Sequence, residues 1–225
     1  MKLTKFYLLA AVLLLAELVV AGWGFVQVGL GATVPIHWDA AGNPNGYGPA
    51  ALGFLLVPAI TIGLAVMFAV IPAVEPRGDN LRRSASAYQT VAAAVTVLMF
   101  GIHVVVVLAG TGREAPVALV VGGGVGLLFA AIGNVMTTVR SNYMFGVRTP
   151  WTLSSDQSWD KTHRVVGRLF VLAGISVVAT SLLGQLQLVI WLLLGSVSVI
   201  LVVAFMYSYL VWRDDPNRRS ASGRS

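Results

Sequence analysis

Two side chains that could do chemistry, Glu17 and His103, stand inside long apolar runs. A charge at the centre of a bilayer costs at least about 2.5–3.5 kcal/mol, so Glu17 needs protonation or a partner. At about 1.5 Å per helical residue, Glu17 lies about 16 Å from the first residue of its apolar run, and His103 lies about 21 Å from the first residue of its own run. If their helices are neighbours, the pair forms either a structural hydrogen bond or part of a proton or ligand pathway.

A second polar group lies in the segment VPIHWDAAGNPNGYGPA, residues 34–50, whose glycines, prolines and asparagines predict tight turns. Nitrogen and oxygen ligands are present, but their spacing does not match a calcium-binding loop. Three interpretations stay open: an ordered cap over the helix ends, a contact site for a ligand or peptide, and a metal site. The residues assigned to this outer loop are Pro35, His37, Trp38, Asp39, Gly42, Asn45, Gly46 and Tyr47.

The third polar group is RSNYMFGVRTPWTLSSDQSWDKTHRVVGR, residues 140–168. Pro150 favours an extended conformation for the residue before it, so the run RTPW (148–151) cannot lie in the middle of a helix. Ser154 and Gln157 have the spacing of a capping box, which predicts a helix that continues into the next apolar run. Trp159, His163 and Val166 would share one face of that helix.

Arg148 lies between Trp151 and the acidic residues Asp156 and Asp160. This arrangement predicts a salt bridge or a cation–π clamp. Such a clamp would serve either the structure alone or a contact with a partner or lipid.

The composition decides the class of protein that must position these groups. The chain has 225 residues, of which 57% are hydrophobic and 11% charged, and it has no cysteine. Soluble proteins are about 45–50% apolar and about 25% charged, so a soluble enzyme and a direct nucleic-acid binder are both excluded as the default. The sequence has no HExxH, GxSxG or intramembrane aspartate pair, and therefore no catalytic residue, cofactor or resident metal is predicted.

Six apolar stretches are long enough to cross a bilayer as helices, which predicts an all-α, polytopic membrane bundle. The stretches are Phe6–Val28, Ala50–Val74, Gln89–Leu108, Pro116–Val139, Val165–Leu183 and Leu188–Tyr209. The length of the first stretch, and Glu17 within it, favour a retained span over a cleaved signal peptide.

The basic residues predict the orientation of the bundle. All of the Lys and Arg side chains except Arg113 fall on one side of the predicted spans, among them Lys2, Arg219 and Arg224. Because cytoplasmic loops of membrane proteins are rich in Lys and Arg, both termini are predicted to be cytoplasmic, in the bacterial cytoplasmic (inner) membrane. The polar residues 213–225 are predicted to be a disordered tail.

Small residues in the fourth span recur every four positions, at Gly122, Gly126 and Ala130, followed by Asn134. This stripe predicts close helix packing, with Asn134 as an interhelical hydrogen-bond donor. A helix broken at Gly122–Gly124 to form a binding site is the alternative.

The run GN (133–134), then Asn142, then GVRTPWTLSSDQSWDKTHRVVGR (146–168) resembles the SdpI family of bacterial membrane immunity proteins. The outer-loop run PIHW followed by GYG resembles an uncharacterised N-terminal module that commonly precedes that family. The family pattern falls on Asn134, Asn142, Gly146, Arg148, Thr149, Pro150, Trp151, Thr152, Trp159, Thr162, His163, Arg164 and Gly167.

The resemblance implies protection of the cell against a membrane-active toxin peptide, with signalling through a sequestered repressor. The implied partners are membrane lipid, a toxin peptide on the outer face and a cytoplasmic repressor. It divides the chain into an N-terminal module (1–76, with outer loop 29–49), an SdpI-like domain (77–212, with motif loop 140–164) and the tail. A small-solute or ion transporter that uses Glu17 and His103 is the alternative function.

Overall fold

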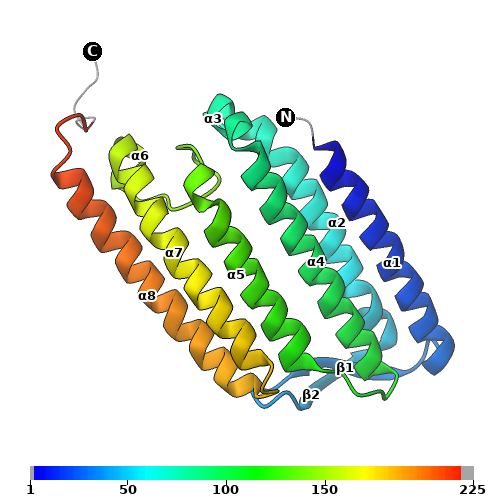
Figure 1. The fold of residues 1–225 in the computed structure, drawn as a ribbon. Coiled ribbons are helices and arrows are strands. Elements are labelled where there is room, and N and C mark those ends of the chain that lie inside the picture. The colour runs from blue at the N-terminus through cyan, green and yellow to red at the C-terminus, as the bar shows by residue number, and fades with distance from the viewer. Residues whose placement is uncertain (1–2, 219–225) are drawn as a thin grey trace.

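The computed structural model describes residues 3–218, which form a bundle of long helices lying side by side (Figure 1). Lys2, Arg219 and Arg224, which contribute to the predicted charge bias, lie outside the described residues, as does the predicted tail from residue 219 onward.

Six helical segments are long and apolar enough to cross a membrane, and each overlaps a predicted span. They are α1 (Thr4–Val28), α2 (Ala50–Val74), α4 (Ala85–Gly110), the continuous segment Ala118–Thr138, α7 (Asp156–Ser181) and α8 (Leu186–Arg213). The fourth segment consists of a π-helical turn η1 (Ala118–Gly122), α5 (Gly123–Val135) and a 3-10 turn η2 (Met136–Thr138). Two short helices, α3 (Gly78–Arg83) and α6 (Pro150–Ser154), lie between spans. The predicted all-α, six-helix membrane class is confirmed.

The bundle has two distinct ends. At the end that we call the arginine-bearing end, α1 begins and α8 ends, and α3, α6 and the motif loop lie there too (Figure 1). Arg113, which follows α4, lies at the opposite end, where its guanidinium is 4.7 Å from the centre of the Trp23 ring. We call this opposite end the hairpin end.

The hairpin end carries a small sheet that the sequence did not predict. Strands β1 (Thr33–Trp38) and β2 (Pro44–Pro49) pair antiparallel, with an irregular register around His37. Val34 is fully buried and packs with Phe54 of α2. The turn of the hairpin reaches the beginning of α8, where the Leu186 side chain lies beside Gly42. The hairpin therefore lies across the ends of the helices (Figure 1).

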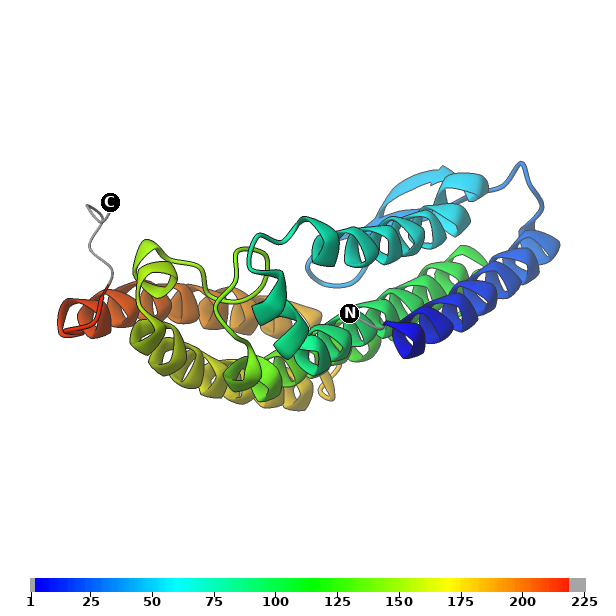
Figure 2. The same cartoon turned by 90° about the horizontal axis from the view of Figure 1, so that it is seen from above.

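The spans pack as two groups of three. Helices α1, α2 and α4 contact one another, whereas α7 contacts both α5 and α8, and α4 joins the groups through α5. Figure 2 shows the two groups from the arginine-bearing end. The predicted boundary at residue 76 assigns α4 to the second domain. In space, however, α4 packs with α1 and α2 of the N-terminal module as well as with α5.

Glycines bring α5 and α7 into close contact. A Cβ atom on Gly174 would lie 2.5 Å from the carbonyl oxygen of Gly126, and one on Gly167 would lie 2.8 Å from that of Gly133. The predicted packing stripe is therefore real, but its last member is Gly133. Asn134 is exposed, so its predicted interhelical hydrogen bond is wrong. The reason is the period of 3.6, which brings residue i+7, and not i+8, back to the face that holds Gly126.

Aromatic rings link the first group of helices to the motif loop at the arginine-bearing end. Phe68 of α2 makes edge contacts with Phe6 of α1 and with Tyr88 of α4, both at 5.7 Å between ring centres. Tyr88 also contacts Phe145 of the motif loop at 6.0 Å. The buried core of the first group therefore continues into the motif loop.

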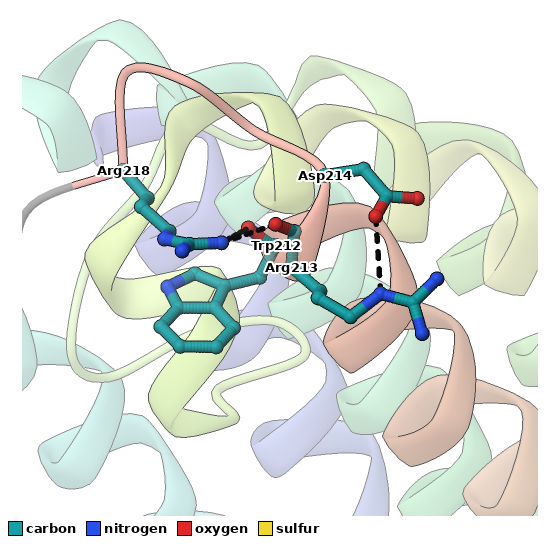
Figure 3. Close-up of polar contacts among 4 residues, drawn as sticks. All are labelled: Trp212, Arg213, Asp214 and Arg218. Carbon is teal, nitrogen blue, oxygen red and sulfur yellow. Dashed lines mark hydrogen bonds and ion pairs between the residues drawn. The ribbon is translucent and has the colours of Figure 1, made fainter.

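The start of the predicted tail differs from the expectation. Helix α8 extends through Arg213, and Asp215 beyond it is buried. Figure 3 shows the Arg213 guanidinium beside the Asp214 carboxylate, at 3.0 Å, and the Arg218 side chain over the Trp212 ring. Local ion pairing and the burial of Asp215 order this short polar segment, which composition alone did not indicate.

Candidate functional site

Helix α6 and the start of α7 fall within the predicted motif loop 140–164, so the name motif loop is kept for residues 139–149. This loop is organised around the side chain of Asn142, which is fully buried. The Asn142 amide nitrogen donates to the carbonyl oxygens of Arg140 and Phe145, at 2.8 and 3.0 Å. Its amide oxygen accepts from the N–H groups of Met144 and Phe145, at 2.9 and 2.7 Å. Because all four hydrogen bonds are local, this one side chain holds the loop in a compact turn.

Two side chains of α7 attach the loop to the bundle. The Trp159 indole N–H donates to the carbonyl oxygen of Val139 at 2.7 Å. His163 Nδ1 bonds the Trp159 carbonyl oxygen at 2.8 Å, and its Nε2 accepts from the Val147 N–H at 3.1 Å. The His163 ring is therefore neutral, with its proton on Nδ1. The predicted shared face of Trp159, His163 and Val166 is confirmed, since all three are buried.

Gly146 lets the loop backbone approach the imidazole. Its φ is +110°, a conformation that favours glycine. A Cβ atom at this position would lie 2.5 Å from His163 Nε2. A residue larger than glycine would therefore displace the loop from the ring that its backbone contacts.

The run RTPW forms a tight helix start. Thr149 is the N-cap of α6, and its side chain and that of Thr152 each accept from the backbone N–H of the other, which is a capping box. The Trp151 ring contacts the rings of Phe205 and Tyr209 on α8, at 4.6 and 5.2 Å between centres. The RTPW turn is thus packed against the last turns of α8.

The predicted capping box at Ser154 and Gln157 is wrong, because Ser154 is the last residue of α6 and Ser155 caps α7. The Ser155 hydroxyl accepts from the Ser158 N–H at 2.9 Å and donates to the Asp215 carboxylate at 2.5 Å. The latter hydrogen bond is the main cause that lowers the pKa of Asp215 below its usual value. The residue that caps α7 and contacts Asp215 is therefore Ser155, one position after the predicted Ser154.

The predicted Arg148 clamp is also wrong. Arg148 is exposed and donates to the carbonyl oxygen of Tyr143 at 2.6 Å. Among residues 3–218, the ion pairs are Arg82 with Asp79 and Arg213 with Asp214, so no carboxylate pairs with Arg148. The Trp151 ring packs instead against Phe205 and Tyr209 of α8.

The loop between α2 and α3 holds the motif loop from the other side, a role that motif reasoning missed. The Glu75 carboxylate accepts from the Tyr143 N–H at 3.1 Å. The Arg77 guanidinium donates to the Tyr143 hydroxyl, to the Leu153 carbonyl oxygen and to the Ser141 hydroxyl. The one available signal was the run Glu75-Pro-Arg77 directly after an apolar span.

The motif residues thus separate into an internal and an exposed set. The side chains of Asn142, Thr152, Trp159, Thr162 and His163 are buried, and Gly167 packs on Gly133. Thr149 and Trp151, both partly buried, face α8, and Pro150 begins α6. Asn134, Arg148 and Arg164 are exposed. Most of the motif therefore builds the loop, and its arginines are left facing outward.

An apolar cavity of about 470 Å³ lies beneath the motif loop. Its walls come from α4, α5, α7 and α8, and its roof is formed by Phe145 to Thr149. It lies within the size range of small-molecule sites, about 300–1,000 Å³. The motif loop therefore closes a cavity as well as joining helices.

The outer-loop residues do not gather into a ligand cluster. His37 Nδ1 is hydrogen-bonded to the Asn45 side chain. The Asp39 carboxylate accepts from the N–H groups of Asn43 and Ala41, each at 2.9 Å, and these hydrogen bonds lower the pKa of Asp39. Within the described residues, no three or more His, Cys, Asp or Glu side chains come together as a metal site.

The remaining outer-loop residues take up hairpin positions. Gly42 has a φ of +87° and lies at the turn, and Gly46 lies opposite His37. Pro35 pairs with Tyr47, and Trp38 ends β1. The side chain of Tyr47 is exposed. These polar groups hold the hairpin together, as expected if the outer loop is an ordered cap over the helix ends.

Glu17 and His103 do meet, but not through both side chains. His103 Nε2 bonds the backbone carbonyl oxygen of Glu17 at 2.9 Å, and the Glu17 carboxyl group accepts from the Thr61 hydroxyl at 3.0 Å. All three side chains are buried, and Glu17 Oε2 and His103 Nδ1 have no hydrogen-bond partner among residues 3–218. The contacts join α1, α2 and α4.

Comparison with known proteins finds similarity in the region of the motif loop and in the region of the outer loop. Residues 138–208 match the SdpI/YfhL protein family, and residues 11–62 match a domain of unknown function, DUF1648. The chain is 23% identical to the immunity protein SdpI of Bacillus subtilis (strain 168) over 176 residues, which cover 78% of this chain and 82% of that protein. No solved structure matches. The resemblance predicted from the sequence is confirmed.

Proposed function

We propose that this multi-pass membrane protein, whose residues 138–208 match the SdpI/YfhL family, is an immunity protein of the bacterial cytoplasmic membrane. It would protect the cell against a membrane-active toxin peptide that arrives at the hairpin end. The observation that carries the proposal is the extent of the similarity to an immunity protein, which covers 78% of the chain and therefore more than the motif loop.

The arrangement of the motif supports a binding and signalling function over an enzymatic one. Its buried polar side chains other than Thr162 are used in hydrogen bonds that build the loop, as at Asn142 and His163. The exposed motif side chains include Arg148 and Arg164, and arginines bind anionic partners and are poor acid–base catalysts because they stay protonated. A cytoplasmic repressor held at the arginine-bearing end is the partner that fits this surface in our proposal.

The test is survival of a toxin-sensitive bacterial strain exposed to a membrane-active toxin peptide that kills it. Expression of this chain is expected to restore survival. Trp159→Leu, which removes the indole hydrogen bond to Val139, is expected to return survival to the level of the empty vector.

The matched control is Gly63→Ala, because a Cβ atom on Gly63 meets nothing within 4 Å. Membrane levels of all variants are measured with an antibody against a tag. Survival no better than that of the empty vector, at normal membrane levels of the unmodified chain, would contradict the proposed function.

A further inference from the structure

The cavity beneath the motif loop is lined almost entirely by hydrocarbon. Val91 of α4, Met136 of η2, Val166 and Phe170 of α7 and Ala204 of α8 contribute to its walls. These residues lie within segments that are long and apolar enough to span a membrane. A binding partner for these walls must itself be largely apolar, because a buried polar group without a hydrogen bond is costly.

The exposed members of the cavity lining lie in two places, which we call its two openings. Leu201 and Phe205 of α8 are 63% and 57% exposed and form the first opening. The second is at the motif loop, where Gly146 and Arg148 are exposed. An acyl chain that enters the cavity from the side of the bundle would therefore have its head-group end near the motif loop.

The charge at the second opening is uncompensated. Arg148 has its Nη1 on the Tyr143 carbonyl oxygen, and no carboxylate of residues 3–218 forms an ion pair with it. Arg77, by comparison, donates to three groups and lies over the Tyr143 ring at 4.6 Å. The free N–H groups of Arg148 can bind a phosphate, whose geometry matches a guanidinium.

These features select one occupant. An apolar cavity that opens sideways within a membrane-spanning bundle and ends at an unpaired arginine fits an acyl chain that carries an anionic head group. A toxin peptide fits less well, because its backbone N–H and C=O groups would face a hydrocarbon wall without partners. We propose that this cavity binds one acyl chain of an anionic phospholipid from the adjacent leaflet, with the phosphate on Arg148.

The experiment uses the full chain in vesicles that contain a photoactivatable phosphatidylglycerol or a photoactivatable phosphatidylcholine. Peptides with the lipid adduct are identified by mass spectrometry. Fragmentation of these peptides locates the adduct, and phosphatidylglycerol is expected to label Leu201 and Phe205 in preference to Leu194, which is also exposed on α8 but does not line the cavity.

Arg148→Ala is expected to reduce this labelling at least about tenfold, the factor for loss of a charge-assisted hydrogen bond of about 1.4 kcal/mol. Arg83→Ala, at an exposed arginine of the same end, is the control and should leave the labelling unchanged. A single exposed side chain is changed in each variant, so folding is expected to be preserved.

Two results would overturn the proposal. One is equal labelling by the two lipids, or equal labelling of the Leu194 and Leu201 positions. The other is labelling of the cavity by a photoactivatable toxin peptide but not by phosphatidylglycerol. Neither result depends on whether the chain confers immunity, because the readout is the site of the adduct.

Discussion

At the residue scale, the motif combines buried structural side chains with two exposed arginines, Arg148 and Arg164. Trp159 and His163 attach the loop to α7, and Gly146 is required where the backbone passes the imidazole. A spacing pattern in the sequence indicated that these residues act together. It did not indicate that Trp151 turns toward α8 and leaves Arg148 unpaired.

Glu17 gives a prediction at this scale. The Glu17 carboxyl group accepts from the Thr61 hydroxyl, and an amide oxygen can accept the same hydrogen bond. Glu17→Gln is therefore expected to preserve both the Tm in detergent and survival in the toxin assay. Glu17→Leu removes the acceptor and is expected to destabilise the bundle by about 0.6–1.7 kcal/mol, measured by thermal unfolding.

The outcome for Glu17→Gln also separates the two readings of the intramembrane pair. A normal Tm with loss of protection would favour a proton or ligand pathway, since an amide does not take up and release a proton as a carboxyl group does. Thr96→Val is the control, because the Thr96 hydroxyl donates to the carbonyl oxygen of its own helix at Ala92.

At the scale of helices and strands, the hydrophobic pattern of the sequence predicted the positions of the six spans well but predicted where each helix begins and ends less well. Each apolar run became a span, because a lipid environment requires all backbone groups to be satisfied within a helix. The hairpin was missed because its strands have six residues each and β2 consists almost entirely of turn-forming residues. The start of α7 moved by one residue because Ser155, and not Ser154, meets the chain beyond α8.

The contact between α7 and the segment after α8 gives a prediction with a pH dependence. The Ser155 hydroxyl lowers the pKa of Asp215, so the ionised carboxylate stabilises the fold above the unfolded-state pKa of about 3.9. This stabilisation is lost as the pH falls through the lower folded-state pKa. Asp215→Asn is therefore expected to lower the Tm at pH 7 by a few degrees.

The difference in Tm between Asp215→Asn and the unmodified chain should narrow below about pH 4, where the carboxylate becomes protonated. Asp214→Asn is a suitable control, because the Asp214 side chain is exposed and pairs only with its neighbour Arg213 within the described chain. A constant difference from pH 7 to pH 3 would show that the charge of Asp215 does not contribute.

At the scale of the whole molecule, the orientation of the bundle gives the most direct prediction. The chain has no cysteine, so a single introduced thiol reports one position. Ala41 is exposed in the hairpin turn and Asp160 is exposed near the start of α7. A membrane-impermeant thiol reagent is expected to label Ala41→Cys in intact cells and Asp160→Cys only after permeabilisation.

Labelling after permeabilisation serves as the control for reagent access to each thiol. If Asp160→Cys reacts in intact cells and Ala41→Cys does not, the bundle has the opposite orientation. The proposed roles of the two ends would then be exchanged, whereas the fold and the lipid cavity would be unaffected.

The sequence by itself determined the membrane class, the six spans and the identity of the motif, because each depends on local hydrophobicity or on residue spacing. It also indicated close packing of the fourth span, although the geometry of the helix replaced Asn134 with Gly133 in the contact. These features need no knowledge of which helices are neighbours.

Only the tertiary structure decided how the polar residues are paired. Glu75 and Arg77 contact the motif loop, and Asp215 contacts Ser155, across more than fifty residues of sequence in each case. The cavity likewise exists because four helices and a loop enclose it. Such contacts depend on the packing angles and rotations of whole helices, which side-chain shape determines at many positions together and no short run of residues encodes.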